Sequence, residues 1–125
     1  MRERVKELRA QANQAEAERG VLAKIAEMQP SDRAMAERVH SLVRTHAPAL
    51  SARTWYGMPA YAKGDDIVCF FRCAEKFKTR YATLGFSDSA HLDDGHMWPT
   101  DFALTQINAS EEARIVALLK KALHA

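Results

Sequence analysis

The hydrophobic period of the chain changes at Pro48, and this change constrains the fold more than any other feature. Before Pro48, apolar residues recur every three or four positions, as they do on one face of a helix. After Pro48 come short runs of aromatic and β-branched residues separated by turn sequences, which is typical of strands. The chain has 125 residues, so we expect both parts to share one domain and one core.

The helical part divides at Gln29-Pro30, because a residue that precedes proline is steered away from the helical conformation. On its N-terminal side, the charged and alanine-rich segment 2–19 predicts a helix with a thin apolar stripe, and 20–28 predicts a second one. We expect residues 1–19 to be a helical lead-in to a single domain that spans 20–125.

A third helix is predicted after Pro30, with Ser31 as its N-cap and an end near Pro48. A final helix is predicted after Ser110, which suits the N-cap position before two acidic residues. Between these helices we expect strands over four runs: Arg53–Tyr56, Ile67–Cys73, Phe77–Leu84 and Phe102–Ile107.

Together these elements predict an α+β fold. The sheet should be antiparallel, with about four to five strands, and the N-terminal helices and the C-terminal helix should pack on one of its faces. The run Ile67–Phe71 is apolar at every position, which predicts a central strand. Cys69 and Cys73 lie four residues apart in this region, about 13 Å along a strand, which is too far for a disulfide. We expect two buried free thiols.

The formal net charge of +2 conceals an uneven distribution. Residues 1–80 carry 15 Lys and Arg against 10 Asp and Glu, whereas residues 81–125 carry 3 against 6. A net charge of this size does not indicate a nucleic-acid-binding protein. With no apolar run near the ~18 residues that span a bilayer, and no secretory signal visible at the N-terminus, we expect a cytoplasmic protein that acts on no membrane.

The segment 76–81 alternates basic residues with Phe77, Thr79 and Tyr81. In a strand, this alternation puts the charges on one face and the rings on the other. Single-strand nucleic-acid binders need both on the same face of a sheet. The pattern therefore predicts a half-solvated strand and argues against nucleic acid as a partner.

The stretch HLDDGHMWP, residues 91–99, places ligand-type side chains close together in sequence. Imidazole and carboxylate ligands suit Fe²⁺, Mn²⁺ or Zn²⁺. Asp93-Asp94-Gly95 is also a common turn sequence, with Leu92, Met97 and Trp98 as apolar anchors around it. Both a weak metal site and a polar turn remain open, and the candidate metal ligands are His91, Asp93, Asp94, His96 and Asp88.

A second candidate site is the aromatic stretch 55–61. Gly57 permits a backbone conformation that other residues avoid, and Pro59 fixes the bend. Aromatic side chains around such a bend favour either a concave pocket or a transition from core to turn. The candidate pocket residues are Trp55, Tyr56, Gly57, Met58, Pro59 and Tyr61. No nucleophile elbow and no phosphate-binding glycine loop occurs, so we do not expect an enzyme.

From Ala23 onward the chain resembles the YdhG-like family of small bacterial proteins, a domain family of unknown function. The matching stretches are AKIAEM, DRAMAERVHSLV, WYGMPAYAKGDDIVCFF, KFKTRYATLGFSD, LDDGHMWPTDFAL and EEARIVALLKKAL. The resemblance implies an α+β fold similar to frataxin in outline. Some members are labelled intracellular iron chaperones, which implies weakly bound iron as cargo and iron–sulfur assembly or haem-synthesis proteins as partners.

On that resemblance, iron would be held by exposed carboxylates rather than by a preformed cage. The counterpart in this chain is the acidic interval Asp88, Asp93, Asp94 and Asp101. The sequence therefore leaves three roles open: an iron-binding protein, a binding module that uses the aromatic stretch for a small molecule or peptide, and an assembly protein. For the last role, the helix over 2–19 would join two monomers into a homodimer.

Overall fold

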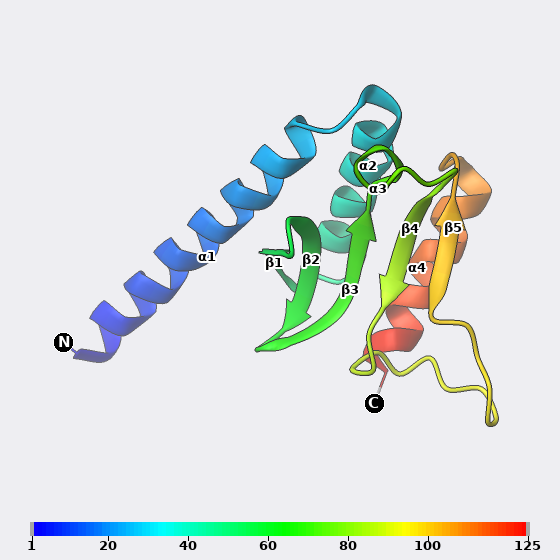
Figure 1. Ribbon diagram of the computed structural model, residues 1–125. Coiled ribbons are helices and arrows are strands. Elements are labelled where there is room, and N and C mark those ends of the chain that lie inside the picture. The colour runs from blue at the N-terminus through cyan, green and yellow to red at the C-terminus, as the bar shows by residue number, and fades with distance from the viewer. Residues whose placement is uncertain (1, 125) are drawn as a thin grey trace.

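A computed structural model describes residues 2–124, with side chains from residue 4 onward, as an α+β fold (Figure 1). Nine elements follow one another along the chain: α1 (Arg2–Ala26), α2 (Pro30–His46), β1 (Ser51–Trp55), β2 (Met58–Lys63), β3 (Asp66–Arg72), α3 (Ala74–Phe77), β4 (Ala82–Phe86), β5 (Asp101–Leu104) and α4 (Ala109–Leu123). Among the described residues, no helix combines the length and the apolar character needed to cross a membrane.

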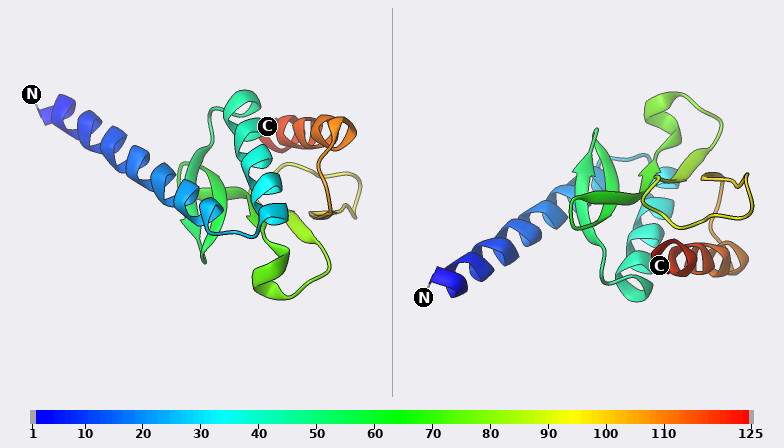
Figure 2. Two further views of the ribbon diagram at one scale, coloured as in Figure 1. Left: turned by 90° about the horizontal axis from the view of Figure 1, so that it is seen from above. Right: turned by 90° about the horizontal axis from the view of Figure 1, so that it is seen from below.

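The five strands form one antiparallel sheet in the order β1-β2-β3-β4-β5. Helices α1, α2 and α4 lie on one face of this sheet, and β3 is its central strand (Figures 1 and 2). The predicted fold class is confirmed. The first turns of α1 project beyond the sheet as an arm, whereas its last turns pack against the sheet (Figure 2).

The N-terminal segment forms one helix, so the prediction of separate helices over 2–19 and 20–28 is wrong. Gly20 lies inside α1, where glycine costs only about 1 kcal/mol relative to alanine. A Cβ added at Gly20 would lie 3.6 Å from the hydroxyl oxygen of Thr54, so α1 approaches β1 closely there. Burial of Val21 and Ile25 against the sheet then outweighs the weak helix propensity of one glycine.

Both predicted N-caps are shifted by two residues. The cap of α2 is Gln29, with Pro30 in the first turn, rather than Ser31. The cap of α4 is Asn108, whose side chain accepts from the backbone of Glu111 while the Glu111 carboxylate accepts from the backbone N–H of Asn108. This reciprocal pair is a capping box, and it satisfies the backbone N–H groups of Asn108 and Glu111.

The largest error of sequence reasoning concerns residues 74–81. The predicted strand Phe77–Leu84 begins only at Ala82, because residues 74–77 form the short helix α3. Lys78 adopts a left-handed conformation with φ of 55°, which ends α3 and reverses the chain. Strand β2 was not expected as a strand, although it holds much of the candidate aromatic stretch.

The main core lies between the sheet and the three long helices. Tyr61, Phe71 and Leu84 from the sheet, with Val39 and Leu119 from the helices, are fully buried there. A smaller apolar cluster lies on the other face of the sheet, built from Met58, Ala60 and Phe70 with Trp55 and Ile67 packed against them. Each face of the sheet therefore has its own set of apolar contacts.

The two cysteines are free and buried, as predicted. Burial raises the pKa of the Cys69 thiol to about 12, because desolvation disfavours the thiolate. Cys69 is therefore an inert core residue.

Candidate functional site

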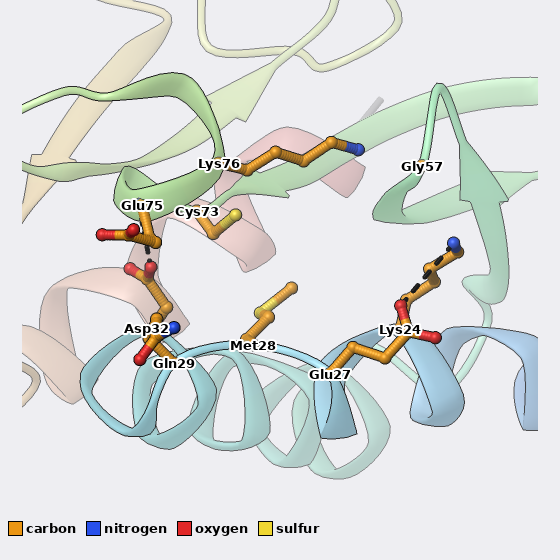
Figure 3. Close-up of a pocket in the computed structure, with 9 residues that line it drawn as sticks. All are labelled: Lys24, Glu27, Met28, Gln29, Asp32, Gly57, Cys73, Glu75 and Lys76. Atoms are coloured by element: carbon orange, nitrogen blue, oxygen red, sulfur yellow. Dashed lines mark hydrogen bonds and ion pairs between the residues drawn. The ribbon is translucent and has the colours of Figure 1, made fainter.

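A cleft of about 390 Å³ opens where the α1–α2 junction, the β1–β2 turn and α3 meet (Figure 3). Three segments that are far apart in the sequence contribute to it. The lining residues are Lys24, Glu27, Met28, Gln29, Asp32, Gly57, Cys73, Glu75 and Lys76.

The buried carboxylate of Asp32 holds one wall of the cleft in place. Its two oxygens accept hydrogen bonds from the backbone N–H groups of Ala74 and Glu75, each at 3.1 Å. These N–H groups belong to the first turn of α3, where they have no partner within the helix. Asp32 on α2 therefore caps α3 across a separation of about forty residues, and it fixes the position of Cys73 beside the cleft.

The opposite wall is the β1–β2 turn. Tyr56 and Gly57 both have positive φ, 50° and 75°, which makes the turn tight. A Cβ added at Gly57 would lie 2.7 Å from Nζ of Lys76, so glycine leaves room for this ammonium at the mouth of the cleft. Gly57 thus has two roles, the turn and the approach of Lys76.

The charges of the cleft are unevenly distributed along its length. Lys24, Lys76 and the carboxylate of Glu27 lie toward the end near Gly57, whereas Asp32 and Glu75 lie at the other end (Figure 3). The sulfur-bearing side chains of Met28 and Cys73 lie between them (Figure 3). Lys24 also pairs with Glu27 at 3.8 Å. Both side chains are largely exposed, so the ion pair is weak and a ligand carboxylate can replace Glu27.

A second polar cluster joins α1, α2 and β2 beneath a depression of about 380 Å³. Nδ1 of His40 lies 3.0 Å from the hydroxyl of Tyr61, and Nε2 lies 3.2 Å from a carboxylate oxygen of Glu18. Arg44 pairs with the same carboxylate. With its proton on Nε2, His40 donates to Glu18 and accepts from Tyr61.

Burial decides the protonation of this cluster. Desolvation lowers the pKa of His40, so the imidazole is neutral near pH 7. Burial, with a smaller contribution from the nearby Cys69, raises the pKa of Tyr61, so its phenol stays protonated. Each group has a hydrogen-bond partner, and the arrangement ties α1 to the core. These contacts indicate a structural role for the cluster.

The candidate aromatic pocket is divided by the sheet. Trp55 pairs with Met58 on the face away from the helices, while Tyr61 is buried under the helices on the other face. Pro59 is fully buried, and Tyr56 is 80% exposed. The structure does not bring these six residues into one pocket, and only Gly57 lines the cleft at the α1–α2 junction.

The candidate metal ligands lie in the long connection between β4 and β5. Gly95 has φ of 66°, in agreement with the predicted turn, and Leu92 is buried as an anchor. Met97 is 88% exposed, so its predicted anchoring role is wrong. Five candidate side chains are exposed: Asp88, His91, Asp93, Asp94 and His96. Within residues 2–124, no three His, Cys, Asp or Glu side chains lie close enough to share a metal ion.

Sequence reasoning missed most of the cleft. Asp32 lies in the first turn of α2, and nothing in the local sequence shows that its carboxylate caps another element. The one local signal for this part of the cleft is Gly57. A glycine between two aromatic residues and a proline indicates a turn with positive φ.

Comparison of the chain with protein-family models, with curated proteins and with solved structures finds no match. The resemblance to the YdhG-like family therefore stays a prediction.

Proposed function

We propose that the protein is a non-enzymatic binding module for a small zwitterionic molecule, held in the cleft between the α1–α2 junction, the β1–β2 turn and α3. The observation that carries this proposal is the uneven charge along the cleft, with two ammonium groups and only the Glu27 carboxylate at one end and the carboxylates of Asp32 and Glu75 at the other (Figure 3). A ligand with a carboxylate and an amino group matches this polarity.

The size and the walls of the cleft support the same class of ligand. A volume of about 390 Å³ falls in the range of small-molecule sites, which is roughly 300–1,000 Å³. Met28 and Cys73 offer a polarizable apolar surface between the charged ends. The ligand should therefore carry a short apolar body, as a free amino acid or a dipeptide does.

The experiment uses three related probes. Methionine carries both charges, N-acetylmethionine keeps only the carboxylate, and methioninamide keeps only the ammonium. Titration of each probe followed by amide chemical shifts should perturb Asp32, Gly57 and Cys73, and methionine should bind most tightly. Glu75→Gln should reduce this preference over N-acetylmethionine, and Lys76→Gln should reduce the preference over methioninamide.

The matched control is Lys120→Gln on α4, which is exposed and removes the same charge far from the cleft. This variant should bind all three probes as the unmodified protein does. Chemical shifts around the cleft that respond to none of the probes, or that respond equally to all three, would contradict the proposal.

A second proposal is weak binding of iron as cargo by the connection between β4 and β5. It is favoured by the exposure of Asp88, Asp93, Asp94 and Asp101 in a part of the sequence without Lys or Arg between Arg80 and Arg114. The described residues form no preformed cage, so the carboxylates would hold Fe²⁺ loosely and release it to iron–sulfur assembly or haem-synthesis partners, as the YdhG-like resemblance implies.

Anaerobic calorimetry with Fe²⁺ tests this second proposal. The double variant Asp93→Asn with Asp94→Asn should abolish the heat of binding. The matched control is Asp65→Asn with Asp66→Asn, an adjacent and exposed acidic pair in the β2–β3 turn, which should bind as before. Heat that is unchanged in the first double variant would remove the site, and no heat in the unmodified protein would remove the proposal.

A further inference from the structure

Aromatic rings and cationic side chains form a continuous row on the sheet face that points away from the long helices. The rings of Tyr56 and Trp55 lie 5.0 Å apart between centroids, and Trp55 lies 5.4 Å from Phe70. The guanidinium of Arg72 lies 5.5 Å from the centre of Phe70 and 5.7 Å from that of Phe77. These five residues are called the ring–cation row below.

The row is on the open face because of strand register and the position of α3. Trp55 and Phe70 project opposite to Tyr61 and Phe71, which pack under the helices. Helix α3 and the turn after it lie on the opposite side of the sheet from α4 (Figure 2). Phe77, on α3, therefore extends the row beyond the end of β3.

The outer members of the row are accessible. Tyr56 is 80% exposed and Phe77 is 42% exposed, and nearby Tyr81 is 37% exposed. Exposed apolar side chains that form a contiguous patch mark interaction sites. Each ring contributed by residues 77–81 also has a cation over it, Lys76 over Phe77 at 5.7 Å from the ring centre and Arg80 over Tyr81 at 5.3 Å.

We infer that the ring–cation row, with Arg80 and Tyr81, binds single-stranded nucleic acid without base specificity. Exposed rings offer stacking surfaces to successive bases, and Arg and Lys beside them attract the phosphates. Charge complementarity points to a polyanion, because the cations of the row and its neighbours are Arg72, Lys76 and Arg80. The adjacent rings favour nucleic acid over an acidic peptide, which has no bases to stack.

A strand over residues 77–81 would put charges and rings on opposite faces and would disfavour such a partner. Instead, α3 and the turn after it bring both to the same side. The small net charge is an average over the molecule and does not describe this face. Two acidic residues lie near this surface. Glu75 pairs with Lys78 at 3.9 Å, and Asp101 lies on β5 opposite Gly85 of β4.

The test measures binding of a fluorescent oligothymidylate of about 12 nucleotides, a length within the ~4–16 that one such surface occupies. Binding should quench the fluorescence of Trp55 and should weaken steeply with salt. Phe77→Ala should weaken binding about tenfold, which corresponds to the loss of one stacked base. Arg80→Ala should lower the slope of log affinity against log salt by about 0.7, as expected for one phosphate contact.

Two controls separate this surface from general effects. Leu8→Ala removes an exposed apolar side chain from the arm of α1, and Lys120→Ala removes a charge from the helical side. Both should bind as the unmodified protein does, and circular dichroism should show that all four variants are folded. The variants avoid every residue that lines the cleft, so a failure of the zwitterion proposal leaves this test unaffected.

Three outcomes would overturn the inference. The first is no binding of oligothymidylate at low salt by the folded protein. The second is an equal loss of affinity in the Phe77→Ala and Leu8→Ala variants. The third is binding of polyglutamate as tight as that of oligothymidylate, which would identify the surface as a site for an acidic protein.

Discussion

Phe70 and Phe71 are consecutive residues of β3, yet they belong to different regions of the molecule. Phe71 is fully buried under the helices, and Phe70 is 8% exposed within the cluster on the open face. Both are nearly inaccessible, but their covers differ: helices cover Phe71, whereas the side chains of Trp55, Met58 and Arg72 cover Phe70. The helices that cover Phe71 stabilise the fold, whereas the side chains that cover Phe70 leave a surface that a partner can bind.

The largest effect that tests this comparison is expected from Phe71→Ala. Removing a fully buried ring from the main core should lower the free energy of unfolding by about 3–5 kcal/mol. Phe70→Ala should cost clearly less, because its neighbours are side chains that can collapse into the space. Urea denaturation of both variants measures the difference. Equal losses would show that the open-face cluster is as much a core as the helix-covered face.

A smaller effect is expected from Gly85→Ala on β4. A Cβ at this position would overlap with the ring of Phe70 on the open face. Because Trp55 and Arg72 confine that ring, overpacking should cost about 1–3 kcal/mol. The double variant with Phe70→Ala should lose less than the sum of the two single variants. Additive losses would mean that Phe70 moves aside freely.

Asp32→Ala tests the link between the two sides of the sheet. The side chain on α2 caps α3, which carries Phe77 to the open side. Its loss should cost about 1–2 kcal/mol and should speed hydrogen exchange at the amides of Ala74 and Glu75. Glu37→Ala, an exposed acid on the same helix, is the matched control. Protected amides in the Asp32 variant would show that α3 is held by other contacts.

The smallest effect concerns pH and the helix-covered face. Burial lowers the pKa of His40 in the folded protein, so the unfolded chain binds its proton more readily. The free energy of unfolding should therefore fall as the pH falls through 6.5, the ordinary pKa, toward the lowered folded value. Thermal denaturation against pH measures this loss. It should shrink in His40→Gln and persist in His46→Gln, an exposed position on α2; an unchanged profile in His40→Gln would exclude His40 as the cause.

Much of the fold was visible in the sequence because its signals are local. The helical periods before Pro48 and after Ser110, and the uniformly apolar run of β3, each reflect which face of one element meets the core. Gly95 was predicted as part of a turn for the same reason, since only neighbouring residues set that conformation. The starts of α2 and α4 were displaced by two residues, because caps depend on fine geometry.

The cleft and the ring–cation row could not be predicted in this way. Residues 76–81 alternate as a strand does, yet residues 74–81 form a helix and a turn because Asp32, far away in sequence, satisfies the N–H groups of Ala74 and Glu75. A four-residue helix has too few internal hydrogen bonds to form alone. Local patterns thus specify the elements that bury a face of their own, and long-range hydrogen bonds and packing determine where Phe77, Lys76 and Arg72 meet.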